Sequence, residues 1–213
     1  MLKFLFLYAF IIATVIHLVG QMLHKEKVRD ISKMAILPLL ATFYILACQY
    51  ISYSFIIALV LLYVGQGMLL FRRKAALIPS GIFFTASHIF VIIAFSQDII
   101  FRSIPLLYYI SVGAVMLGIL SAVLVYLRNY IPKNILVFVG IYLFSSILMS
   151  VFAYFRLACS SVLISLLGTI LLFGSNVLLI LARFDDSKTW LSRFVVEPVY
   201  ITSVLLITIS FMV

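Results

Sequence analysis

The chain has 213 residues with a mean hydropathy of +1.33, and 66% of them are hydrophobic while only 10% are charged. About 25% of the residues of a soluble domain are charged, so this composition excludes soluble enzymes and soluble cofactor-binding domains. A membrane span takes roughly 20 apolar residues, so eight spans leave only about 50 residues for loops and ends. The net charge of +9 therefore indicates membrane topology. No basic surface large enough to bind a nucleic acid duplex is left.

Apolar runs between charges and turn residues predict eight membrane-spanning helices. The runs are long and continuous, unlike the segments of about 10 alternating residues that form membrane β-barrels. The predicted spans are roughly 2–21, 34–50, 52–71, 75–96, 105–127, 134–155, 157–182 and 195–213. The sequence therefore predicts an all-α fold, a polytopic membrane helical bundle that forms one transmembrane domain over residues 1–213.

The basic residues fall unevenly on the two sides of these spans. Twelve of the 15 Lys and Arg residues follow spans 1, 3, 5 and 7, and the other three are Lys3, Arg102 and Arg156. The positive-inside rule places the first group in the cytoplasm and both termini outside. The first run could also be a secretory signal peptide. It lacks a small-residue cleavage pattern, however, and an even number of helices requires it, so we expect it to be retained.

Polar side chains inside the spans are the residues that need an explanation in a membrane. A rise of 1.5 Å per residue places four of them about 9 to 12 Å from the basic edge, namely His17, Gln66, Asn176 and Tyr200. All six acids, Glu197 among them, fall in or next to predicted loops, which disfavours a transporter built on central carboxylates. Hydrogen bonding between helices is the other interpretation of each polar side chain.

Two similar segments connect Gln66 with Asn176. LLYVGQGMLL (61–70) and LLFGSNVLLI (171–180) share an aromatic residue, a small residue, an amide and an aliphatic run. We predict that the two amides face each other across a cavity between spans 3, 4, 7 and 8. Close approach of the helices is expected at the small residues Gly65, Gly67, Gly174 and Ser175.

The histidines and cysteines are the remaining candidates for catalysis, metal binding or a disulfide. His88 lies about 20 Å from the basic edge, where it is either a structural hydrogen-bonding group or an acid or base. Three histidines and two cysteines show no metal-ligand spacing, so we expect no metal and no cofactor. Cys48 and Cys159 both fall near the outer face, where a disulfide is geometrically possible.

Four motifs, in order along the chain, carry a family resemblance. They are Lys33 at the start of the second span, YVGQGMLL at the end of the third, SGIFFTASHIFVIIAF in the fourth and GTILLFGSNVLLILARF in the seventh. Tyr200 stands at the aromatic position of the last-helix block. Through these motifs nearly the whole chain resembles the YhhN family of membrane proteins, which includes the lysoplasmalogenases.

The resemblance implies hydrolysis of the vinyl ether bond of lysoplasmalogens to a fatty aldehyde and a glycerophospho-alcohol. This reaction needs an acid that protonates the alkene carbon and a directed water molecule, and carboxyl groups suit both roles. The family aspartates of the Gly-Asp and Ser-Asp motifs correspond here to Gln66 and Asn176, and an amide cannot act as a proton donor of this kind. Lys33 also lacks the following Pro, Val91 replaces a Tyr, and Ser203 replaces a Gln.

Two hypotheses follow. In the first, the chain is a hydrolase whose candidate catalytic residues are Gln66, Asn176 and His88, with His17 as a further acid or base. In the second, a catalytically silent relative binds a single-chain lipid or a membrane partner in the same cavity. The candidate substrate-binding residues are Lys33, Ser175, Tyr200, His17 and Ser203. We expect a lysophospholipid or an alkenyl lysolipid as the partner and, from the compact size, a bacterial inner membrane as the location.

Overall fold

The computed structural model describes residues 2–71, 76–99, 101, 104–156, 161–185, 190 and 192–212, and regular secondary structure within them is helical. The elements are α1 (Leu2–Met22), α2 (Glu26–Ala47), α3 (Tyr53–Leu69), α4 (Leu77–Ser96), α5 (Leu106–Leu127), α6 (Lys133–Phe155), α7 (Val162–Phe184), the π-helical turn η4 (Ser192–Val196) and α9 (Glu197–Ser210). The predicted all-α bundle is confirmed.

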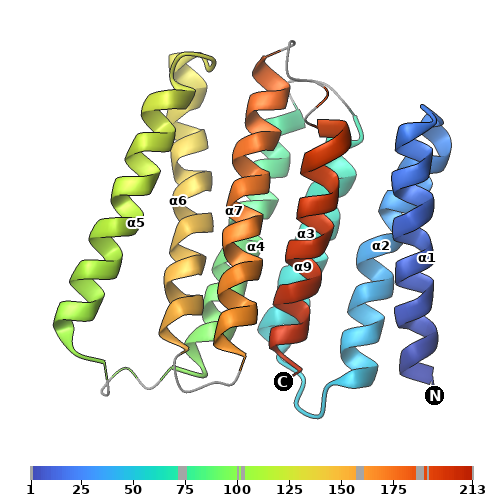
Figure 1. Ribbon diagram of the computed structural model, residues 1–213, viewed down its shortest axis with the longest axis horizontal. Coiled ribbons are helices and arrows are strands. Elements are labelled where there is room, and N and C mark those ends of the chain that lie inside the picture. Colours follow the sequence, from blue (N-terminus) through green and yellow to red (C-terminus); the bar gives the residue numbers. More distant parts are fainter. Residues whose placement is uncertain are drawn as a thin grey trace.

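Six of the helices are long and apolar enough to cross a membrane, namely α1, α2, α4, α5, α6 and α7. Two others, α3 and the apolar helix over Phe194–Ser210, are shorter. The 17 residues of α3 extend only about 25 Å, less than the hydrocarbon thickness of about 30 Å. The helices stand side by side, and the N- and C-termini lie at the same end of the bundle (Figure 1).

The central helices form the core, and the outer helices present apolar side chains outward. In Figure 1, α3, α4, α7 and α9 lie between the α1–α2 pair on one side and α5 with α6 on the other. The closest pairs are α1 with α2, α3 with α4, and α7 with α9, while α6 packs on both α4 and α7. Only Leu120 and Leu127 of α5 are buried. Such an outer helix suits contact with lipid.

Glycines allow two close helix contacts. A Cβ atom on Gly65 of α3 would lie 2.6 Å from Cε1 of Phe84 on α4, so only glycine leaves room for this ring. A Cβ on Gly168 of α7 would lie 3.0 Å from the backbone nitrogen of Ile207 on α9. The prediction of close approach is wrong for Gly174, because a Cβ there meets nothing within 4 Å.

Helix α2 begins at Glu26, eight residues before the predicted start of that span at 34. The charged residues 26–33 resemble a loop in the sequence, but a charged first turn is compatible with a helix end near the membrane surface. Glu26 also interacts favourably with the helix dipole at the N-terminus. As a consequence Lys33 belongs to the helix, and its side chain is only 12% exposed.

The predicted last span, 195–213, is interrupted at its beginning. The chain forms the π-helical turn Ser192–Val196 and then continues as α9, with Pro198 in the first turn of that helix. Because Pro198 has no N–H, it cannot donate to the carbonyl of Phe194 four residues earlier. Wider π-type turns occur where this ladder is disturbed, often at functional sites. Glu197 lies directly at this junction.

Candidate functional site

A cavity of about 270 Å³, which we call the polar pocket, lies between α2, α3, α4, α7 and the beginning of α9. Its lining residues are Lys33, Gln66, Leu69, Phe84, Ser175, Asn176, Leu179, Val196, Glu197 and Tyr200. Five residues that the sequence singled out therefore come together here from four helices. The predicted walls from spans 3, 4, 7 and 8 are all present, and α2 adds a fifth.

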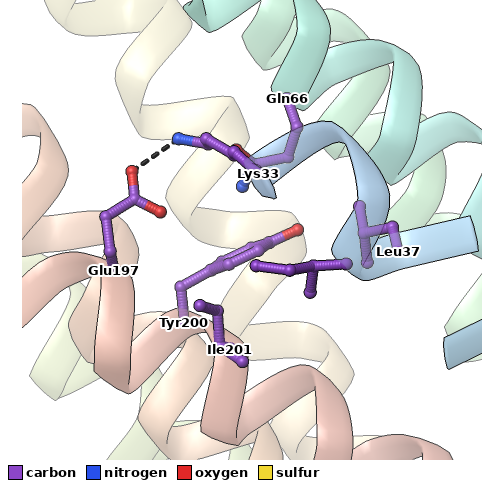
Figure 2. A pocket seen from close by; sticks show the side chains of 7 residues that line it. Lys33, Leu37, Gln66, Glu197, Tyr200 and Ile201 are labelled. Carbon is purple, nitrogen blue, oxygen red and sulfur yellow. Dashed lines mark hydrogen bonds and ion pairs between the residues drawn. The ribbon is translucent and has the colours of Figure 1, made fainter. Parts of the chain in front are cut away.

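A second cavity of about 220 Å³ adjoins the polar pocket and shares Lys33, Gln66, Glu197 and Tyr200 with it. Ile36, Leu37 and Ile201 complete its wall. Figure 2 shows Lys33 reaching from α2 toward the carboxylate of Glu197, with the Tyr200 ring below and Gln66 on the neighbouring helix. Polar side chains thus occupy the boundary between the two cavities.

Lys33 and Glu197 form an ion pair across the bundle. The ammonium Nζ donates to Oε1 at 2.5 Å, and the two side chains are 12% and 16% exposed. Removing two charges from water is costly, and their attraction offsets this cost only when the geometry is good. The pair therefore fixes α2 against the start of α9 and holds a carboxylate inside the pocket.

His17 on α1 approaches the other oxygen of Glu197. Its Nε2 lies 3.8 Å from Oε2, and its ring is fully buried. The Nδ1 atom lies 3.0 Å from the carbonyl oxygen of Arg29, which can only accept a hydrogen bond, so Nδ1 carries the hydrogen. Nε2 therefore faces the carboxylate, and a proton on either atom makes this contact attractive.

Gln66 and Asn176 are both buried, at 5% and 4% exposure, so neither faces lipid. Nδ2 of Asn176 donates to Oγ of Ser146 on α6 at 3.1 Å. Oε1 of Gln66 has no hydrogen-bond partner among the described residues. The two amides line one pocket, and Gln66 retains an acceptor for a further polar group.

The structure places three of the predicted residues elsewhere. His88 stacks on Tyr142 and lies 2.9 Å from Oγ of Ser145, outside the lining of the polar pocket. The Ser203 hydroxyl donates to the backbone carbonyl of Tyr200 at 2.6 Å and does not reach the pocket lining. His17 is not in the lining and contacts the pocket through Glu197. Depth along a helix does not specify which way a side chain points.

Glu197 is the residue that sequence reasoning missed. Like the other five acids, Glu197 falls in or next to a predicted loop, so the sequence did not place it inside the bundle. Tyr200 follows three residues later, and residues spaced by three share one face of a helix. Since Tyr200 already belonged to the predicted polar layer, this spacing was the available signal.

The Cys48–Cys159 disulfide that the sequence allows falls partly outside the described residues, because Cys159 is not among them. Cys48 lies at the C-terminal end of α2, and its Sγ is 3.3 Å from the carbonyl oxygen of Phe211. The thiol therefore contacts the end of α9.

One of three comparisons with known proteins identifies a family for this chain. No curated protein and no solved structure matches the chain. A family model described as YhhN family matches residues 28–211, which include every residue that lines the polar pocket, while α1 lies before the matched segment. Because this match covers most of the sequence and all of the pocket, the chain belongs to the YhhN family.

Proposed function

We propose that this chain is a lysoplasmalogenase-type hydrolase that cleaves the vinyl ether bond of a single-chain lysolipid in the polar pocket. One observation carries the proposal: the Glu197 carboxylate lies in the same pocket as Gln66 and Asn176, the two amides at the positions where the resemblance implies aspartates. The pocket thus retains a carboxyl group, from a different helix. We further propose that it opens to the cytoplasmic side of a bacterial inner membrane, where most basic residues gather.

The chemistry begins with proton transfer to the alkene carbon that is not bonded to the ether oxygen, which leaves an oxocarbenium ion. Water adds to the carbon bonded to oxygen and loses a proton, and the hemiacetal then breaks its C–O bond to give the aldehyde and the alcohol. The Glu197 carboxyl group delivers the first proton and, as the carboxylate, accepts the proton from water. One water molecule is consumed, and the carboxyl group is regenerated.

The surroundings of Glu197 support this role. His17 faces Oε2 through Nε2, so a proton held at that contact is available to the carboxyl group. Lys33 stabilises the carboxylate that forms after proton transfer. Gln66, with its acceptor oxygen unpaired among the described residues, is placed to orient the attacking water.

A catalytically silent lipid-binding protein is the second candidate, and the ion pair favours it. Lys33 stabilises the ionised form of Glu197, which cannot donate a proton. Gln66 and Asn176 cannot donate one as acids either. In this case the pocket binds a lysolipid or a membrane partner without turnover.

Aldehyde release by the purified full-length protein separates the two candidates. Alkenyl and acyl lysolipids with the same head group and chain length serve as substrate and control. We expect turnover of the alkenyl lipid alone and a loss of about 10²- to 10⁴-fold in Glu197→Gln. Glu26→Gln, which changes an exposed glutamate at the start of α2, is the matched control and should retain the wild-type rate. Wild-type turnover that persists in Glu197→Gln, or no turnover at all, would overturn the proposal.

A further inference from the structure

A third cavity, of about 270 Å³, lies between α4, α6 and α7 and is almost entirely apolar. Its lining residues are Leu77, Ser80, Gly81, Phe84, Phe138, Val139, Tyr142, Leu179 and Ile180. The hydroxyl of Ser80 donates to the carbonyl of Leu77 at 2.9 Å, so it presents no free polar group. We call this space the apolar cavity.

The apolar cavity adjoins the site described above. Phe84 and Leu179 line both the apolar cavity and the polar pocket. Both spaces are small, and they meet at these two side chains. A ligand that passes Phe84 and Leu179 would place a polar part in the polar pocket and an apolar part in the apolar cavity.

Two glycines build the aromatic walls. A Cβ on Gly81 would lie 2.8 Å from Cε1 of the Phe138 ring, a close contact like the one between Gly65 and Phe84. Both rings lie against backbone that has no side chain, and a larger residue would displace them toward the cavity. The shape of this space is thus set by helix packing.

Tyr142 provides the polar exception. Its side chain is 5% exposed, and its hydroxyl has no hydrogen-bond partner among the described residues. Buried hydroxyls are normally paired, so this one calls for an explanation. A ligand that joins a hydrocarbon chain to an ether or ester oxygen supplies both an apolar surface and one acceptor.

We propose that the apolar cavity holds the hydrocarbon chain of a single-chain lipid whose polar part occupies the polar pocket, an inference that rests on the proposed function. The hydrocarbon chain leaves a bilayer that is as apolar as the cavity, so the hydrophobic effect contributes little to the binding of this lipid. It selects the chain by shape, and it places the bond next to the chain beside Gln66 and Glu197.

Photolabelling with an acyl lysophosphatidylcholine that carries a diazirine in its chain tests the inference on the full-length protein. The probe has no vinyl ether, so labelling does not depend on turnover. We expect adducts at the cavity-lining residues of α4, α6 and α7. Val139→Phe fills the cavity, since Val139 is 2% exposed, and should reduce these adducts about tenfold. Val137→Phe makes the same change on the same helix at a 70% exposed position and should leave them unchanged.

Adducts spread over lipid-facing residues of α1 and α5 in the wild type would overturn the inference, whether or not the variants fold. Equal labelling of the cavity in both variants would also overturn it. Labelling of the cavity in a protein that releases no aldehyde from the alkenyl lysolipid would support the hydrocarbon-chain site and reject the hydrolase proposal. Aldehyde release together with labelling outside the apolar cavity would support the hydrolase proposal and reject the hydrocarbon-chain site.

Discussion

Lys33 and Glu197 hold opposite charges at a place where water is scarce, and each residue depends on the other. A buried pair contributes little relative to apolar residues of the same size, but removing one partner leaves an uncompensated charge. The arrangement therefore indicates a role other than stability for the carboxylate.

Lys33→Met should lower the free energy of unfolding by about 3 kcal/mol, because Glu197 loses its counter-charge. The double variant Lys33→Met with Glu197→Leu should recover most of this loss. Thermal unfolding in detergent measures both, and Lys133→Met at the exposed start of α6 is the control. A single variant as stable as the wild type would show that the pair is solvated.

Gln66→Asp combined with Asn176→Asp should increase the rate of vinyl ether hydrolysis. Asp is smaller than Gln and similar in shape to Asn, so the pocket accepts both changes, and positioned acids or bases contribute about 10²- to 10⁴-fold. Aldehyde release measures the effect. Gln97→Asp with Asn134→Asp, both at exposed positions, adds the same charges elsewhere as a control. An unchanged rate in the pocket variant would show that positions 66 and 176 take no part in the reaction.

The sequence could predict which residues gather but not all of the directions in which they point. Gln66, Asn176 and Tyr200 share a depth because each helix rises uniformly, and the structure brings them to one pocket. His88 and Ser203 are also buried, but they face other neighbours. Rotation about the helix axis depends on packing, which no single span determines.

At the scale of helices, the apolar runs predicted the element order because spans are long and uniform. The start of α2 was misplaced, since charged residues 26–33 are as compatible with a loop as with a helix end at the membrane surface. The π-helical turn directly precedes Glu197 and Pro198, and the apolar run of the last span does not indicate it. Hydropathy therefore located the helices but not the start of α2 or the turn before Glu197.

Gly168→Ala should destabilise the α7–α9 contact by about 1 to 3 kcal/mol, because its Cβ would meet the backbone of α9. Gly174→Ala lies on the same helix with open space around it and should be neutral or slightly stabilising. Thermal unfolding of the two variants gives the comparison. Equal stabilities would mean that α7 and α9 adjust their separation at no cost.

At the scale of the whole molecule, both termini lie at one end of the bundle (Figure 1), as an even number of spans requires. The distribution of basic residues predicts that this end faces the outside. A C-terminal alkaline phosphatase fusion, which is active only outside the cytoplasm, should be active, and a fusion between α3 and α4 should not. The reverse pattern would invert the topology.

The short helix α3 has a consequence for the lipid around it. Its length of about 25 Å is less than the hydrocarbon thickness, and a bilayer adapts to such a mismatch by local thinning. Gln66 lies within one turn of the α3 end, and Glu197 lies at the start of α9. Local thinning at α3 would bring the headgroup layer and its water toward these two residues. A hydrolase with its site at this depth would take water from the thinned bilayer surface and would need no separate channel.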